Sequence, residues 1–63
     1  MKVYKINTDG SSVAVTSENS LSDEEVIRKA YEQDIIDTTN ANVEDITDDD
    51  DERKAFADVT YPI

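Results

Sequence analysis

The side chains in this sequence with the widest chemical capacity are carboxylates, and they are crowded into one short stretch. Seven acidic residues fall between positions 44 and 52. They are Glu44, Asp45, Asp48, Asp49, Asp50, Asp51 and Glu52. Carboxylates can transfer protons in catalysis, bind hard cations or attract a cationic partner, and the rest of the sequence decides among these roles.

Catalysis is disfavoured by the residue types that the chain lacks. It has no histidine, the commonest general base, and no cysteine, so neither a Ser/His nor a Cys/His nucleophile pair can form. Its single glycine, Gly10, excludes a glycine-rich phosphate loop. The carboxylates cluster on surface-type segments, with no cleft to tune them for proton transfer. We therefore expect a non-enzymatic protein with no cofactor.

Metal binding is suggested by the alternation of Asp48, Asp50 and Glu52, because Ca²⁺ and Mg²⁺ prefer oxygen ligands. An EF-hand loop, however, needs a central glycine and a distal bidentate glutamate, and this segment has neither. The sequence therefore predicts diffuse association of cations and no defined metal site.

A surface that imitates a nucleic-acid backbone is a third role for the same acids. Alternate residues of a strand lie about 6.7 Å apart, and helical residues four apart lie about 6 Å apart at Cβ. Both distances are of the order of the charge spacing along one nucleic-acid strand, so folded carboxylates can occupy several phosphate-like positions at once. Three acids form a flanking patch in this candidate partner-binding set: Glu32, Asp34 and Asp37. The alternative is a solvated, disordered acidic segment that serves solubility.

Charge is distributed unevenly between the two halves of the chain. Residues 1–31 carry five acids and four bases, whereas residues 32–63 carry eleven acids and two bases, so the halves have net charges of −1 and −9. This asymmetry repels nucleic acid and anionic membranes, and it favours as partner a cationic nucleic-acid-binding protein or complex. No apolar run is long enough for a signal peptide or a membrane span, so we expect a cytoplasmic protein.

The first sixteen residues read as a β-hairpin that would support the acidic half. Two runs rich in β-formers flank Asp9-Gly10, a strong signal for a two-residue hairpin turn. Centring the turn there pairs Ile6 with Val13 and Tyr4 with Val15, which places all four side chains on one face. Turn chemistry and apolar alternation thus predict the same register.

Residues 22–33 carry the start signals of a helix. Ser22 is the predicted N-cap, with Glu25 completing a capping box, and Leu21 and Val26 can form a hydrophobic staple. The predicted apolar stripe, which should face the hairpin, consists of Val26, Ile27, Ala30 and Tyr31.

The remaining residues complete an α+β pattern in one domain, residues 1–63. Residues 43–47 read as a third strand with Val43 or Ile46 turned inward, and residues 59–61 read as a short final strand. Residues 48–57 could form a short helix, with acids first and bases later, or remain a mobile acidic loop. The order β-β-α-β, then helix or loop, then β predicts a small antiparallel-rich sheet with the main helix packed on one face.

In its length, charge, lack of cysteine and histidine, and concentration of acids in one half, the chain resembles a class of small acidic inhibitors. Phages and mobile elements encode such proteins against host defence, and the class includes anti-CRISPR and anti-restriction DNA mimics. The resemblance implies a non-enzymatic inhibitor that blocks a DNA- or RNA-binding defence complex. It transfers no individual functional residue.

A different function class is also compatible with the sequence. A small regulatory or assembly module would bind a protein partner through an apolar surface or through an open sheet edge near residues 59–63. Salt discriminates between the two, because contacts between exposed charges weaken steeply as salt rises and apolar contacts do not.

Overall fold

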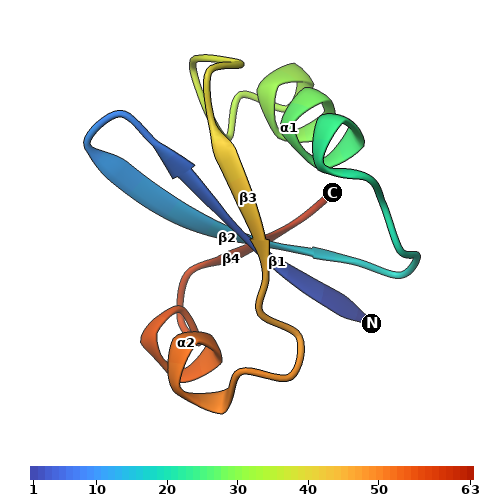
Figure 1. Cartoon of the computed structure of the whole chain (residues 1–63), viewed down its shortest axis with the longest axis vertical. Helices are drawn as coiled ribbons and strands as arrows, with labels where there is room; N and C mark the ends of the chain where they lie inside the picture. Colours follow the sequence, from blue (N-terminus) through green and yellow to red (C-terminus); the bar gives the residue numbers. More distant parts are fainter.

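The computed structural model describes all 63 residues, which form a four-stranded sheet and two helices. The elements are β1 (Lys2–Thr8), β2 (Ser11–Ser17), α1 (Asp23–Glu32), β3 (Asn42–Asp45), α2 (Asp50–Ala55) and β4 (Thr60–Pro62) (Figure 1). The strand order is β3-β1-β2-β4, with β1 antiparallel to both neighbours and β4 parallel to β2. The predicted α+β fold with a mainly antiparallel sheet is therefore confirmed. Neither helix has the length and apolar character that crossing a membrane requires.

The hairpin has the register that its turn predicts. Ile6 pairs with Val13 and Tyr4 with Val15. Gly10 adopts a φ of 96°, a left-handed conformation that glycine reaches without the steric cost of a Cβ. The turn residue thereby fixes which side chains of both strands face α1.

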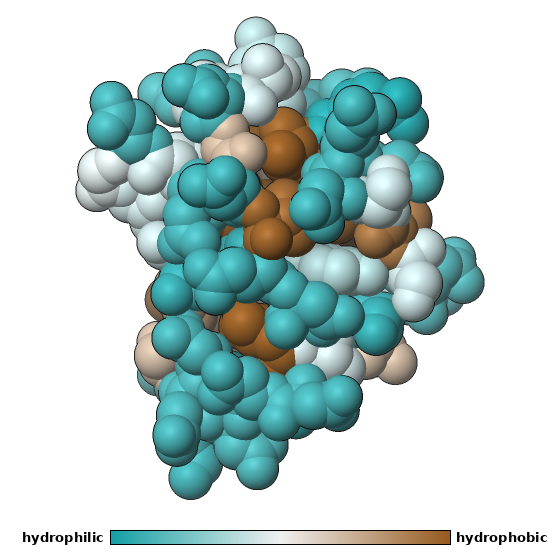
Figure 2. Space-filling view, in the orientation of Figure 1, coloured by the Kyte–Doolittle hydropathy of each residue, from teal (hydrophilic) through white to brown (hydrophobic).

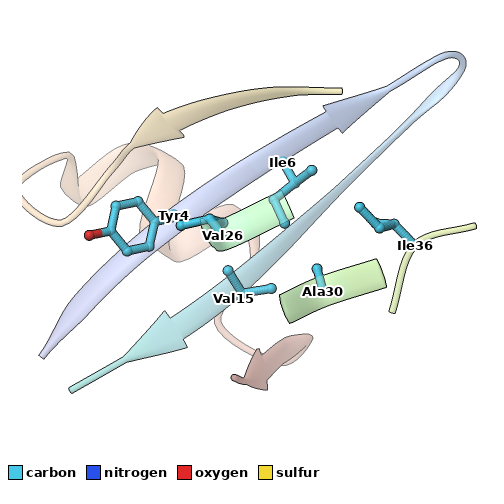
Figure 3. Close-up of a cluster of buried hydrophobic side chains, with 6 residues drawn as sticks. All are labelled: Tyr4, Ile6, Val15, Val26, Ala30 and Ile36. Atoms are coloured by element: carbon cyan, nitrogen blue, oxygen red, sulfur yellow. The ribbon is translucent and has the colours of Figure 1, made fainter. Parts of the chain in front are cut away.

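The main hydrophobic core lies between this face of the hairpin and α1. It consists of Tyr4, Ile6, Val15, Val26, Ala30 and Ile36 (Figure 3). The predicted stripe of α1 is wrong for Tyr31, which is 47% exposed. Successive helical residues are about 100° apart, so a stripe centred on Val26 and Ala30 leaves Tyr31 at the boundary with solvent.

Both ends of α1 are fixed by local contacts. At the start, the Ser22 hydroxyl accepts the Glu25 N–H at 3.3 Å and donates to the Glu25 carboxylate at 3.2 Å, which confirms the N-cap. At the end, Asp34 adopts a φ of 60°, which an aspartate tolerates better than most residues. The chain reverses there, and the Ile35 N–H donates to the Ala30 carbonyl at 2.9 Å. This reversal brings Ile36 into the core, 7% exposed.

The opposite face of the sheet is covered in part by α2. Val3 and Ala14 point away from α1, because they alternate along their strands with the residues of the main core. Both are nonetheless buried. Lys5, also on this face, pairs with Glu52 of α2 at 3.2 Å, and its ammonium lies 6.0 Å from the centroid of the Phe56 ring. The sheet therefore has one helix on each face.

The third strand is shorter than predicted and ends at Asp45. Both of its candidate inward residues are used: Val43 packs against the main core, and Ile46 is 2% exposed just beyond the strand. The Ile46 N–H donates to the Val3 carbonyl at 3.0 Å, so pairing with β1 continues past the strand end.

Replacing Ile6, which is fully buried, with alanine should lower the free energy of unfolding by about 2–5 kcal/mol because it leaves a cavity under α1. Val13→Ala, at the partly buried rim of the same face, is the matched control and should cost clearly less. Urea unfolding followed by circular dichroism measures both, and equal losses would contradict the packing described.

Ser22→Ala should lower the free energy of unfolding by about 1 kcal/mol, because the Glu25 N–H loses its acceptor. Ser22→Asp keeps an acceptor at the N-cap and should retain most of the stability. The cap would be shown to be unimportant if the melting temperatures of both variants matched that of the wild type.

Candidate partner-binding surface

The acidic segment after β3 is folded. Of the two alternatives for residues 48–57, a short helix and a mobile loop, the structure shows the helix, α2. Asp49 is the N-cap of α2, and its carboxylate accepts the Glu52 N–H at 3.2 Å. The acids that follow occupy the first turn and the bases Arg53 and Lys54 the last turn. The exposed N–H groups at a helix start carry partial positive charge, so this end of α2 tolerates closely spaced carboxylates.

Five aspartates line one open depression of about 710 Å³ with no hydrophobic residue in its wall. This depression, called the acidic hollow below, is formed by Asp45, Asp48, Asp49, Asp50 and Asp51. Figure 2 shows a largely hydrophilic surface at the bottom of the molecule, where α2 and the loop before it lie. No group of three or more acidic side chains is placed to hold a metal ion. The carboxylates of the hollow are instead spaced apart, an arrangement that several separate cationic groups could contact at the same time.

Asp45 is the most firmly held of these carboxylates. It accepts the Thr47 hydroxyl at 2.6 Å and the Thr47 N–H at 3.0 Å, and it pairs with the Lys2 ammonium at 3.1 Å. These donors stabilise the ionised form, so the pKa of Asp45 is lowered from 3.8 to about 2, with the Thr47 hydroxyl as the largest cause. The hydrogen bond from Lys2 and its charge act in the same direction, and Asp45 in turn raises the pKa of Lys2.

Three further acids of the predicted set make contacts within the protein. Glu52 pairs with Lys5 at 3.2 Å, and Glu44 accepts a hydrogen bond from the Asn7 amide at 2.9 Å. Asp50 lies 3.7 Å from the Arg53 guanidinium, a long and exposed ion pair. The contacts of Glu44 and Asp50 are exposed and add little stability, because exposed ion pairs contribute about 0–1 kcal/mol, whereas the Lys5–Glu52 pair is partly buried.

Asp48 and Asp51 differ from the rest of the acidic hollow. Both are exposed, and neither carboxylate takes part in a hydrogen bond or an ion pair of the structure. They are thus the two aspartates of the hollow whose carboxylates have no partner within the protein. Sequence alone could not separate them from Asp49, since all three belong to one uniform run.

The structure does not bring the predicted flanking patch next to the acidic hollow. Asp34 and Asp37 line a separate depression beside Thr8 and Ser11 at the tip of the hairpin. Asp45, by contrast, contacts Lys2 at the other end of β1. Asp45 pairs with Tyr4, four residues before Thr8 along β1, so about 13 Å of strand separates the two groups. Glu32 is the last residue of α1, which lies at the opposite end of the molecule from α2 (Figure 1).

Sequence reasoning also missed the residues that position the carboxylates. The contact of Asp45 with Thr47 is predictable locally, because an aspartate side chain often accepts the backbone N–H two residues later and so closes a turn. No local signal identifies Lys2 and Lys5. Their partnership with Asp45 and Glu52 requires β3 and α2 to lie beside β1.

The pKa of Asp45 predicts a pH dependence of stability. Because this pKa is lower in the folded protein, the ionised carboxylate stabilises the fold above about pH 3.8, and that contribution is lost as the pH falls toward about 2. Thr47→Val removes the main donor and should move the pKa back toward 3.8, as measured by a carbon-13 NMR titration of the carboxyl group. An unchanged titration in that variant would show that Thr47 is not the cause.

Comparison with known proteins found no matching family model, no similar curated protein and no similar solved structure.

Proposed function

We propose that the protein is a non-enzymatic inhibitor that presents carboxylates in place of phosphates and so blocks the nucleic-acid-binding groove of a cationic partner. The observation that carries this proposal is the acidic hollow, where five aspartates stand on folded backbone. The partner class is a DNA- or RNA-binding defence complex of the anti-CRISPR or anti-restriction target type. The protein itself binds neither nucleic acid nor membrane, because its charge of −10 repels both.

The folded state of the acidic segment supports this function. A disordered acidic tail would lose conformational entropy when it became ordered on a partner, and that loss weakens binding. Here the Asp49 cap and the contacts of Asp45 hold the backbone before binding. Lysine and arginine side chains that bind phosphates in nucleic acid also form charge-assisted hydrogen bonds with carboxylates, and the two kinds of bond are of similar strength.

The acids divide into supporting and contacting groups. Asp45, Asp49 and Glu52 are bound within the protein and maintain the shape of the acidic hollow. Asp48 and Asp51 have no internal partner and contribute their charge directly to the interface. Their mutual repulsion in the free protein is relieved when cationic groups enter between them.

A protein-interaction module that does not imitate nucleic acid is the second candidate function. It is favoured by two exposed apolar side chains near the end of the chain, Val59 at 53% and Tyr61 at 41%. Binding through them would persist at high salt, whereas binding through the acidic hollow would not.

The double variant Asp48→Lys/Asp51→Lys should abolish partner binding and leave the fold intact, because these exposed carboxylates have no structural contacts. The control Glu32→Lys/Asp37→Lys changes the net charge by the same amount at the other end of the molecule and should bind normally. Each variant is immobilised and exposed to a bacterial lysate, and captured nucleic-acid-binding proteins are identified by mass spectrometry.

Two competition measurements complete this test. Duplex DNA and rising salt should each release the captured partner from the wild-type protein. The proposal is wrong if the partner holds DNA and this protein at the same time, or if the two double variants capture it equally. Release that is insensitive to salt would support the apolar module instead.

A further inference from the structure

The two edges of the sheet differ in what they offer to another strand. At the β4 edge, the Ile63 N–H donates to the Thr16 carbonyl of β2 at 2.9 Å. Backbone groups alternate in direction along a strand, so those of Tyr61 also face β2, and those of Thr60 and Pro62 face outward. Proline has no N–H, so this edge presents a single donor, from Thr60. Pro62 therefore makes β4 a poor template for a further strand.

The β3 edge is open. Val3 directs both backbone groups toward the β3 side, since its carbonyl accepts the Ile46 N–H at 3.0 Å and its N–H donates to the Thr47 hydroxyl at 2.9 Å. By alternation, Lys5 and Asn7 do the same, opposite Glu44 and Asn42.

The N–H and C=O groups of Val43 and Asp45 therefore point away from the sheet. None of the turn, loop or side-chain hydrogen bonds uses them. In Figure 3, β3 is the outermost strand next to β1.

The side chains of β3 set the chemistry of a strand that could pair there. Val43 packs toward the core, and Asp45 lies on the same face of the sheet, whereas Glu44 points to the face that α2 covers in part. A second copy paired antiparallel with Val43 opposite Asp45 would set Glu44 against Glu44, which is destabilising. Lysine or arginine opposite Glu44 and Asp45 would instead form favourable cross-strand pairs.

We propose that β3 is a docking strand that accepts an extended, basic segment of a partner protein as a fifth strand of the sheet. Antiparallel pairing, the slightly more stable arrangement, requires a basic residue opposite Asp45, a basic residue opposite Glu44 and an apolar residue opposite Val43. The docking strand recognises this basic-basic-apolar order through two backbone positions and three side chains. It does not depend on phosphate mimicry by the acidic hollow.

The probe is a capped synthetic peptide of sequence Thr-Lys-Lys-Val-Thr, added to the nitrogen-15-labelled protein. Amide signals of Val43 and Asp45 should shift, and their hydrogen exchange should slow, because both N–H groups gain acceptors. A peptide with N-methyl groups on the first lysine and on the valine keeps its charge and loses the donors that meet β3. It should bind more than about tenfold more weakly. Equal binding of the two peptides, or no change at Val43 and Asp45, would overturn the proposal.

Variants test the same edge from the protein side. Val43→Pro removes the outward N–H and keeps the backbone bonds of its neighbours to β1, whereas Val43→Ala removes only the side chain. The proline variant should lose more than about tenfold in affinity, and the alanine variant should lose clearly less. If both bind alike while the hairpin signals remain unchanged, the docking strand is wrong. The Asp48→Lys/Asp51→Lys protein should still show the Val43 and Asp45 shifts, so failure of the proposed function is distinguishable from failure of this inference.

Discussion

Alternation of side chains along β1 is the constraint on which the rest of the structure depends. This central strand pairs with β2 and β3, and its successive residues point to opposite faces. Tyr4 and Ile6 build the core under α1, while Lys5 on the other face reaches Glu52 of α2. A shift by one residue would bury the lysine and expose the core. The Asp9-Gly10 turn prevents that shift by fixing the pairing with β2.

The fold accommodates its charge by placing a few bases where the acids are densest. Lys2, Lys5 and Arg53 each approach one acid of the run between positions 44 and 52. These partners reduce local repulsion without neutralising the surface, and the first turn of α2 contributes its helix dipole. The outcome is a charged region whose backbone is held in place while part of its charge remains unpaired. Stability itself comes mainly from the small core, since exposed ion pairs contribute little.

Features governed by neighbours in sequence were predictable, and features governed by distant partners were not. The hairpin register and the Ser22 cap follow from local turn and capping rules, and the structure confirms both. The burial of Ile36 depends on the chain reversal at Asp34, and the parallel pairing of β4 depends on β2, so neither could be derived locally. For the candidate surface, the acidic run was evident in the sequence. Its division into supporting and free carboxylates, and the separation of Asp34 and Asp37 from it, arise only when β3 and α2 lie beside β1.

The parallel pairing of β4 with β2 has a consequence for how the protein opens. β4 has three residues, all exposed, and it joins a strand more than forty positions earlier in the chain. Few bonds therefore oppose the entropy gained when this segment is released. Detachment uncovers the backbone of Ala14 and Thr16 in β2, an edge whose natural complement is the same strand of a second molecule. The pairing that completes the sheet is thus one that two molecules can exchange, which is the geometry of a domain swap.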